Sequence, residues 1–122
     1  MCGFVAFFQA APIVDLESAR CALKKIVHRG PDAAGEWQER NVLMLHRRLS
    51  IIDLSTGQQP MQSGDARFVI VFNGEIYNFP ELRGELEAEG VRFQTRSDTE
   101  VILEGYRYWG ERVVERLNGM FA

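Results

Sequence analysis

The sequence begins "MCGFVAFF" (residues 1–8), which places a cysteine directly after the first methionine and ahead of a short apolar run. Such a run is typical of a strand that is buried on at least one face, so we predict a strand at residues 2–8. Taken alone, Cys2 reads as a small hydrophobic residue that packs well. If Met1 is removed, the Cys2 thiol and a free α-amine belong to one residue. That amine, with a reference pKa of about 7.7 to 8.0, can accept the thiol proton. Cys2 is therefore a candidate nucleophile.

The composition indicates one globular domain over residues 1–122. Of the 122 residues, 46% are hydrophobic, and the formal net charge is -3. These values suit a buried core and argue against a nucleic-acid partner. No apolar run approaches the roughly 20 residues that span a bilayer, and the basic start of a signal peptide is missing. We therefore expect no membrane association and a cytoplasmic location.

The two cysteines, Cys2 and Cys21, lack the spacing of a disulfide framework or a metal site. We expect no metal and no cofactor for this segment. Cys21 is predicted to pack inside, and His28 and His46 are predicted to be structural because neither has a partner pattern. Trp37 and Trp109 are expected in the core or partly buried.

The spacing of apolar residues beyond residue 8 predicts both helices and strands. Helical periodicity with boundary signals predicts helices from Asp15 to Gly30, from Pro80 to Gly90 and from Ser97 to Gly110. In the last of these, Val101, Ile102, Tyr106 and Trp109 are expected to face the core. Extended runs predict strands at 42–49, on both sides of Asn73-Gly74 and at 92–96, with a loop at 55–65. This mixed order predicts a single α+β domain without repeats.

Asn73 and Gly74 lie in "FNGEIYN" (residues 72–78) and have two interpretations. An Asn-Gly pair between apolar extended runs is the strongest short hairpin signal, which predicts a turn. The same pair offers the Asn73 side-chain amide and the Gly74 backbone N–H as donors to a developing oxyanion.

Two charged motifs likewise have two interpretations each. "SDTE" (residues 97–100) can be a capping box in which Ser97 and Glu100 close the start of a helix. Alternatively, Asp98 pairs with a substrate ammonium in a pocket. Arg48, in "HRRLSI" (residues 46–51), is either solvated or binds a carboxylate through its planar guanidinium.

The order of these motifs along the chain resembles the class II glutamine amidotransferases, and more narrowly the N-terminal domain of glutamine-hydrolysing asparagine synthetase. The likeness is carried by "MCG" (1–3), "HRGPD" (28–32), "HRRLSIIDL" (46–54), "GQQPM" (57–61), "NGEIYN" (73–78) and "SDTE" (97–100). It implies an N-terminal-nucleophile hydrolase fold, an αββα four-layer sandwich of antiparallel sheets.

The resemblance also implies a role for individual residues. Cys2 would be the nucleophile, and Asn73 and Gly74 would form the oxyanion hole. Substrate glutamine would be held by Arg48 at its α-carboxylate, by Glu75 and Asp98 at its α-ammonium, and by the backbone around Leu49 and Ile51. The "RGPD" loop, residues 29–32, should lie close to Cys2.

The chain itself lacks the Gly-rich pyrophosphate loop of such synthetases. The resemblance therefore implies a fragment truncated at its C-terminus, with a synthetase domain in cis that uses ATP and magnesium to amidate aspartate. A homodimer of the full-length enzyme is compatible with this interpretation, and the isolated fragment is expected to be marginally stable. Two alternatives stay open: an amidotransferase of the same branch with a different acceptor, and an inactive interaction module that retains the fold.

Overall fold

The computed structural model describes residues 2–11, 15–50 and 55–122. In chain order its elements are β1 (Gly3–Phe8), α1 (Leu16–Lys25), η1 (Val27–Arg29), β2 (Ala33–Glu39), β3 (Val42–Arg48), β4 (Met61–Gln62), β5 (Val69–Ile70), β6 (Gly74–Ile76), α2 (Phe79–Ala88), α3 (Asp98–Trp109), η2 (Gly110–Arg112), α4 (Val113–Arg116) and β7 (Gly119–Phe121). All strand pairs within these described residues are antiparallel. The predicted mixture of helices and antiparallel sheets is therefore confirmed.

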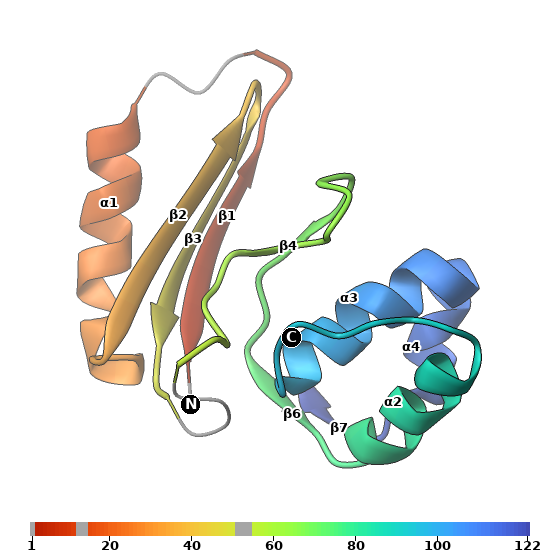
Figure 1. Cartoon of the computed structure of the whole chain (residues 1–122). Helices are drawn as coiled ribbons and strands as arrows, with labels where there is room; N and C mark the ends of the chain where they lie inside the picture. Colours follow the sequence, from red (N-terminus) through yellow and green to blue (C-terminus); the bar gives the residue numbers. More distant parts are fainter. Residues whose placement is uncertain (1, 12–14, 51–54) are drawn as a thin grey trace.

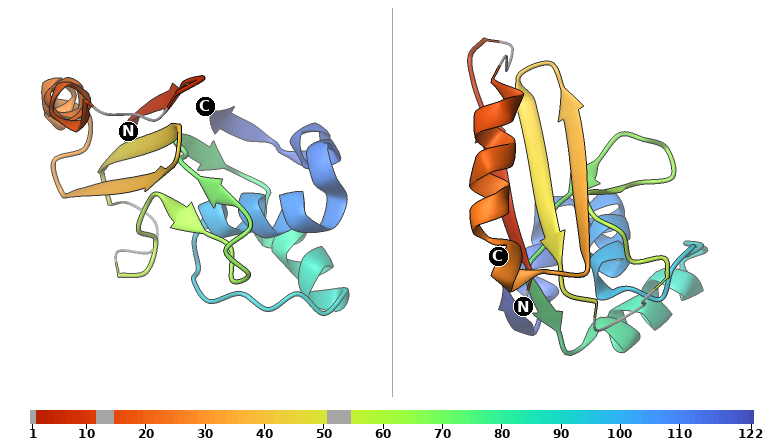
Figure 2. Two further views of the ribbon diagram at one scale, coloured as in Figure 1. Left: turned by 90° about the horizontal axis from the view of Figure 1, so that it is seen from above. Right: turned by 90° about the vertical axis from the view of Figure 1, so that its left-hand side faces the viewer.

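The elements are arranged in successive layers. In Figure 1, α1 covers one face of the three-stranded sheet, whose order is β1-β3-β2. The two-stranded sheets β4-β5 and β6-β7 lie beyond its other face, and α2, α3 and α4 lie on the far side of them. Figure 2 shows the same arrangement from two further directions.

Strand β3 directs apolar side chains toward α1 and, near its end, buried polar side chains to the opposite face. Leu43 and Leu45 are fully buried and pack with Ala19 and Leu23 of α1. Because successive side chains of a strand point to opposite faces, His46 lies on the other face, toward the rest of the molecule. It is fully buried there. Buried polar groups on an inner sheet face are unusual and need partners.

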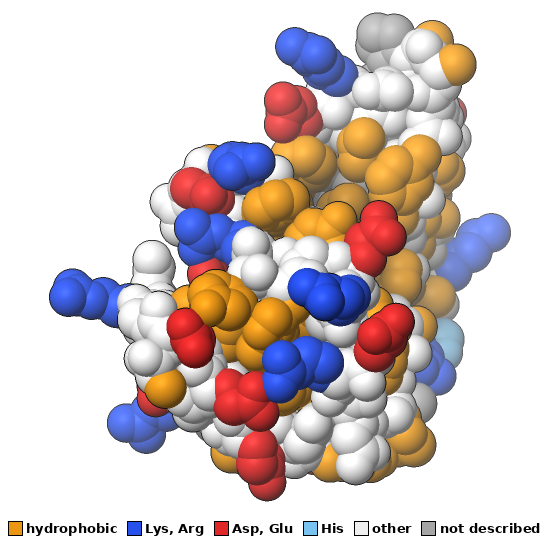
Figure 3. Space-filling model, turned by 90° about the vertical axis from the view of Figure 1, so that its right-hand side faces the viewer, with side chains coloured by type: hydrophobic (Ala, Val, Ile, Leu, Met, Phe, Trp, Pro, Cys, Tyr) orange, Lys and Arg blue, Asp and Glu red, His pale blue; other side chains and the backbone are white. Residues whose placement is uncertain are grey.

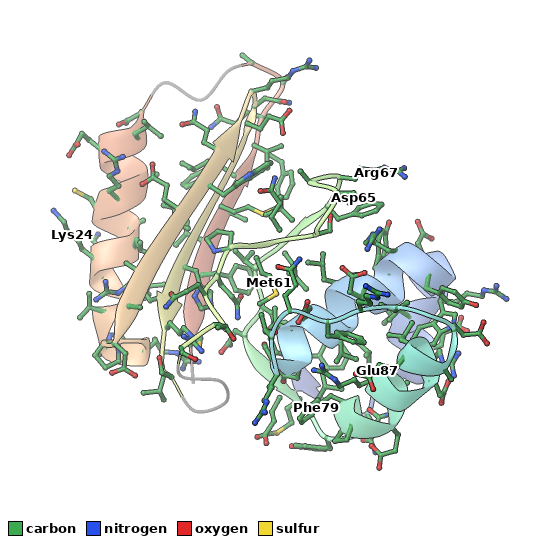
Figure 4. All side chains as sticks on the ribbon, in the orientation of Figure 1. Lys24, Met61, Asp65, Arg67, Phe79 and Glu87 are labelled. Atoms are coloured by element: carbon green, nitrogen blue, oxygen red, sulfur yellow. The ribbon has the colours of Figure 1, made fainter. Side chains whose placement is uncertain are left out.

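A second core joins the small sheets to the helices. Its buried members are Phe72, Ile76, Leu82, Leu86 and Val101. Met61 of β4 is also buried, and its side chain lies in the interior of the molecule in Figure 4, whereas Lys24 extends outward from α1. The face of the molecule shown in Figure 3 carries interspersed acidic and basic side chains. Within α2, Arg83 and Glu87 form an ion pair.

The predicted turn at Asn73-Gly74 is wrong. Asn73 and Ala122 exchange two backbone hydrogen bonds, of 3.0 Å and 2.9 Å, and Gly74 begins β6, which pairs with β7. Strand β5 pairs back with β4 instead. A Cβ atom at Gly74 would lie 2.1 Å from the Met120 carbonyl oxygen. Glycine is thus required by the close approach of a distant strand, not by a turn.

The predicted strand at 92–96 is also wrong. The carboxylate of Glu100 accepts the backbone N–H groups of Gln94 and Thr95 at 2.8 Å and 2.7 Å. The segment therefore turns around a side chain, and it pairs with no strand among the residues that the structure describes. Ser97 caps α3 as predicted, but the reciprocal capping box with Glu100 does not form. The Ser97 hydroxyl accepts the N–H of Thr99 at 3.0 Å, but Glu100 is engaged with the preceding loop.

Several predictions on single residues and boundaries also need correction. Tyr106 is 40% exposed, and Cys21 is exposed, so neither belongs to the core. The first predicted helix is α-helical only to Lys25 and continues as η1 to Arg29. Strand β2 was not predicted, because its polar and small residues lack an apolar run. No helix in the described part of the chain is long and apolar enough to cross a bilayer.

Candidate functional site

A cavity of about 140 Å³ opens between the large sheet, the small sheets and the start of α3. Its lining comes from segments that are far apart in the sequence: Cys2, Arg48, Leu49, Gly57, Gln59, Phe72, Gly74, Glu75, Ser97, Asp98, Thr99 and Met120. The lining combines a thiol, a guanidinium and two carboxylates. A concave site with a few convergent polar groups is the default candidate for ligand binding.

Cys2 is held at the cavity by the residues that follow β3. The Leu49 N–H lies 3.3 Å from the Cys2 sulfur, and the thiol donates to the Leu49 carbonyl at 3.5 Å. The register explains this contact, because Gly3 pairs with Arg47 and the next antiparallel pair brings Cys2 to the end of β3. Arg29 Nε also donates to the Cys2 carbonyl at 3.3 Å. The predicted proximity of the "RGPD" loop to Cys2 is confirmed at Arg29.

Arg48 ends β3 and is 4% exposed. It lies on the inner face of the sheet, two residues after His46, and its backbone is tied to the preceding loop. The N–H of Asp32 donates to the Arg48 carbonyl at 3.0 Å, and the Ser50 N–H donates to the Asp32 carboxylate at 2.8 Å. These bonds fix the end of the strand that carries the guanidinium into the cavity wall.

The backbone N–H of Gly74 points away from β7. In an antiparallel pair, hydrogen-bonded and non-hydrogen-bonded residue pairs alternate. Asn73 and Ala122 exchange both bonds, so Gly74 and Phe121 form the non-bonded pair. The N–H of Ile76, two residues on, faces the same side and donates to Asp98 Oδ2 at 3.1 Å. Gly74 therefore directs its N–H to the side of the strand on which Asp98 lies.

Asp98 is a buried carboxylate, 5% exposed, at the first turn of α3. Burial raises the pKa of Asp98 above its ordinary value, and the negative charge of Glu75 acts in the same direction. Hydrogen bonds from Ile76 and Thr99 oppose this rise. Two carboxylates in one cavity wall, one of them desolvated, form an environment that favours a bound cation.

The structure brings most of the predicted site residues to one place. Cys2, Arg48, Leu49, Gly74, Glu75 and Asp98 all line the cavity. Asn73 directly precedes Gly74 but is not among the lining residues, and its Oδ1 atom is buried without a hydrogen-bond partner in the described part of the chain. Ile51 lies outside the described residues.

Six lining residues were not predicted as part of the site. They are Gly57, Gln59, Phe72, Ser97, Thr99 and Met120. Ser97 and Thr99 belong to the "SDTE" motif, whose local pattern indicates a helix cap. Gly57 and Gln59 belong to "GQQPM", whose composition indicates a loop. No local signal marks Met120, since it reaches the cavity only through the pairing of β7 with β6.

Comparison with known proteins shows the family to which this domain belongs. The family model for the glutamine amidotransferase domain matches residues 1–122. The chain belongs to this family.

Its relatives include asparagine synthetases. The chain is 48% identical over 126 residues to asparagine synthetase [glutamine-hydrolyzing] 1 of Bacillus subtilis (strain 168), covering 100% of this chain and 20% of the relative. It is 44% identical over 140 residues to a putative asparagine synthetase [glutamine-hydrolyzing] of Mycobacterium tuberculosis (strain ATCC 25618 / H37Rv), with 100% and 21% covered. It is 39% identical over 124 residues to asparagine synthetase [glutamine-hydrolyzing] 2 of Oryza sativa subsp. japonica, also with 100% and 21% covered. The chain thus spans about a fifth of the length of these relatives.

Proposed function

We propose that this domain hydrolyses glutamine to glutamate and ammonia through a thioester on Cys2. The observation that carries the proposal is the lining of one cavity by Cys2, Arg48 and Asp98, which come from three separate segments of the chain. Together they supply a nucleophile, a cation and an anion. Free glutamine presents an amide, a carboxylate and an ammonium, so each of its groups has a partner of suitable chemistry.

Substrate binding in this proposal uses the two charged ends of the amino acid. The Arg48 guanidinium pairs with the α-carboxylate, for which its planar donor geometry is suited. Asp98 and Glu75 hold the α-ammonium, which offsets the cost of keeping the Asp98 carboxylate ionised and buried. Backbone groups around Leu49 complete the pocket. The δ-carbonyl is then presented to the Cys2 sulfur.

The reaction requires the removal of Met1, because only then is the Cys2 nitrogen an amine that can accept a proton. The amine takes the thiol proton, and the sulfur attacks the δ-carbonyl carbon. The resulting oxyanion receives hydrogen bonds from the Asn73 side-chain amide and the Gly74 N–H. The C–N bond breaks as the protonated amine returns its proton to the leaving ammonia. Water then cleaves the γ-glutamyl thioester and regenerates the thiol.

The proposal extends to the fold and to the partner. The order of layers in Figure 1, with helices outside and sheets inside, supports an N-terminal-nucleophile hydrolase fold. By analogy with its relatives, we propose that the released ammonia is used by a synthetase domain in the same polypeptide. That domain would use ATP and magnesium to convert aspartate to asparagine, and no step assigned to these 122 residues involves either.

Labelling of the Met1-processed protein tests this proposal. A glutamine-like electrophile such as 6-diazo-5-oxo-L-norleucine should modify Cys2, and excess glutamine should prevent the modification. Cys21 is exposed and serves as an internal control for nonspecific alkylation. Mass spectrometry of the digested protein locates the adduct. Equal labelling of both cysteines, without protection by glutamine, would favour the inactive interaction module.

A further inference from the structure

The backbone of Phe72, the residue before Asn73, is held by two side chains and not by a neighbouring strand. Its N–H donates to Gln59 Oε1 at 2.6 Å, and its carbonyl lies 3.1 Å from His46 Nε2. Phe72 lies where the chain leaves β5, which pairs with β4, and enters β6, which pairs with β7. The two side chains replace the sheet contacts that are missing at this crossover.

Gln59 is the more informative of the two side chains because it lines the cavity. It is 8% exposed, and its Nε2 group donates to Thr99 Oγ1 at 3.4 Å. The orientation of its amide is determined by its partners, since a backbone N–H can only donate. Gln59 must present its oxygen to Phe72 and its nitrogen to Thr99.

The hydrogen bonds continue from Thr99 to Asp98. The Thr99 hydroxyl lies 3.5 Å from Asp98 Oδ1. Since Thr99 accepts from Gln59, its own proton is available for this carboxylate. One amide therefore connects the segment that carries Asn73 and Gly74 to the residue that would bind the ammonium of glutamine.

The Gln59 backbone is itself anchored against the large sheet. A Cβ atom at Gly35 of β2 would lie 1.8 Å from the Gln59 carbonyl oxygen. Only glycine permits this approach. The Gln59 side chain thus extends from a main chain that is packed on β2. Because this main chain has little room to move, it cannot shift to compensate for a substitution of the side chain.

From this geometry we infer that Gln59 is a positioning residue for glutamine hydrolysis, which holds the Phe72 peptide so that the donors of Asn73 and Gly74 meet the oxyanion formed at Cys2. This inference rests on the proposed function. Gln59 does not touch the reacting atoms. Its effect is expected in the turnover step, where the oxyanion develops, and less in the binding of glutamine.

The test compares Gln59→Leu with Gln59→Glu and with the matched control Gln58→Leu in the Met1-processed protein. Gln58 is the adjacent, exposed glutamine and does not line the cavity. We expect Gln59→Leu to lower glutaminase kcat by about 10²-fold, which is typical when reacting groups are misplaced by roughly 1 Å. KM should change less than threefold. Gln59→Glu keeps an acceptor for the Phe72 N–H, so its kcat should be at least tenfold higher than that of Gln59→Leu. Gln58→Leu should retain the parent values.

Two further measurements separate positioning from folding. Alkylation of Cys2 by iodoacetamide forms no oxyanion, so its rate should be the same in Gln59→Leu and in the parent. Hydrogen exchange should accelerate in residues 71–76 only. Acceleration across the whole domain, or an unchanged kcat in Gln59→Leu, would overturn the inference. If the parent protein had no Cys2-dependent glutaminase activity, the proposed function itself would fail.

Discussion

Replacing Asp98 by asparagine should stabilise the domain and weaken its binding of glutamine. The carboxylate is 5% exposed, and its raised pKa means that the folded state binds a proton more tightly than the unfolded chain, whose ordinary value is 3.8. The contribution of Asp98 to stability therefore falls as the pH rises above 3.8 toward the folded pKa, and it stays low at pH 7. Asparagine carries no charge, and its oxygen can still accept the Ile76 N–H.

The binding effect has the opposite sign. A substrate ammonium about 4 Å from a carboxylate gains about 4 kcal/mol at an effective dielectric constant of about 20. Part of this gain is offset by desolvation of the ammonium, and the asparagine oxygen retains a neutral hydrogen bond. We therefore expect a net loss of about 2 to 3 kcal/mol, or roughly a 30- to 160-fold higher KM. The kcat should change much less.

The assay combines thermal unfolding without glutamine with steady-state glutaminase kinetics. The Asp98→Asn protein should have the higher Tm at pH 7, and this advantage should disappear below pH 3.8. Asp65→Asn is the matched control, because Asp65 is exposed on the loop between β4 and β5 (Figure 4) and does not line the cavity, so KM should stay unchanged. A variant of Asp98 that melted at a lower temperature and kept its KM would refute this reasoning.

Three further predictions concern the oxyanion donors and the inner sheet face. Asn73→Ala should lower kcat by about 10²- to 10³-fold, because one oxyanion donor contributes about 2.7 to 4 kcal/mol; unchanged turnover in rapid-quench assays would remove Asn73 from the site. Gly74→Ala places a Cβ atom 2.1 Å from the Met120 carbonyl oxygen and should cost about 1 to 3 kcal/mol of stability in urea unfolding. A melt indistinguishable from the parent's would contradict the observed strand approach. Burial lowers the pKa of His46 below 6.5 in the folded state, so the parent should lose stability as the pH falls below 6.5. His46→Gln should flatten this part of the stability curve, and an equally steep decline in the variant would assign the pH dependence to other groups.

Local patterns predicted the elements whose own residues carry a clear signal of apolar content or periodicity. The strand at Gly3–Phe8 and the helix at Asp98–Trp109 follow from an apolar run and from helical periodicity. Strand β2 escaped prediction because its small and polar residues form no apolar run, although it pairs with β3 as β1 does. The role of Glu100 also could not be predicted from its local pattern, which favours a helix cap. Its carboxylate instead accepts the backbone N–H groups of Gln94 and Thr95, which reach it only because the loop folds back.

The candidate site, too, could be predicted only in part from the sequence. The chemical identity of Cys2, Arg48 and Asp98 could be read from short motifs, because charge and nucleophilicity belong to the residue types themselves. Their convergence could not, because it depends on the register of β1 with β3 and on the contact of the Ile76 N–H with Asp98.

The sequence by itself determined the family of this domain, the mixture of helices and strands, and the set of groups able to bind and cleave an amino-acid amide. The tertiary structure alone decided that Asn73-Gly74 continues into a strand and not a turn, and that Gln59 and Met120 reach the cavity. The physical reason is that hydrogen bonds between distant segments satisfy backbone groups as well as a local turn does. Which of the two forms depends on the packing of the whole chain.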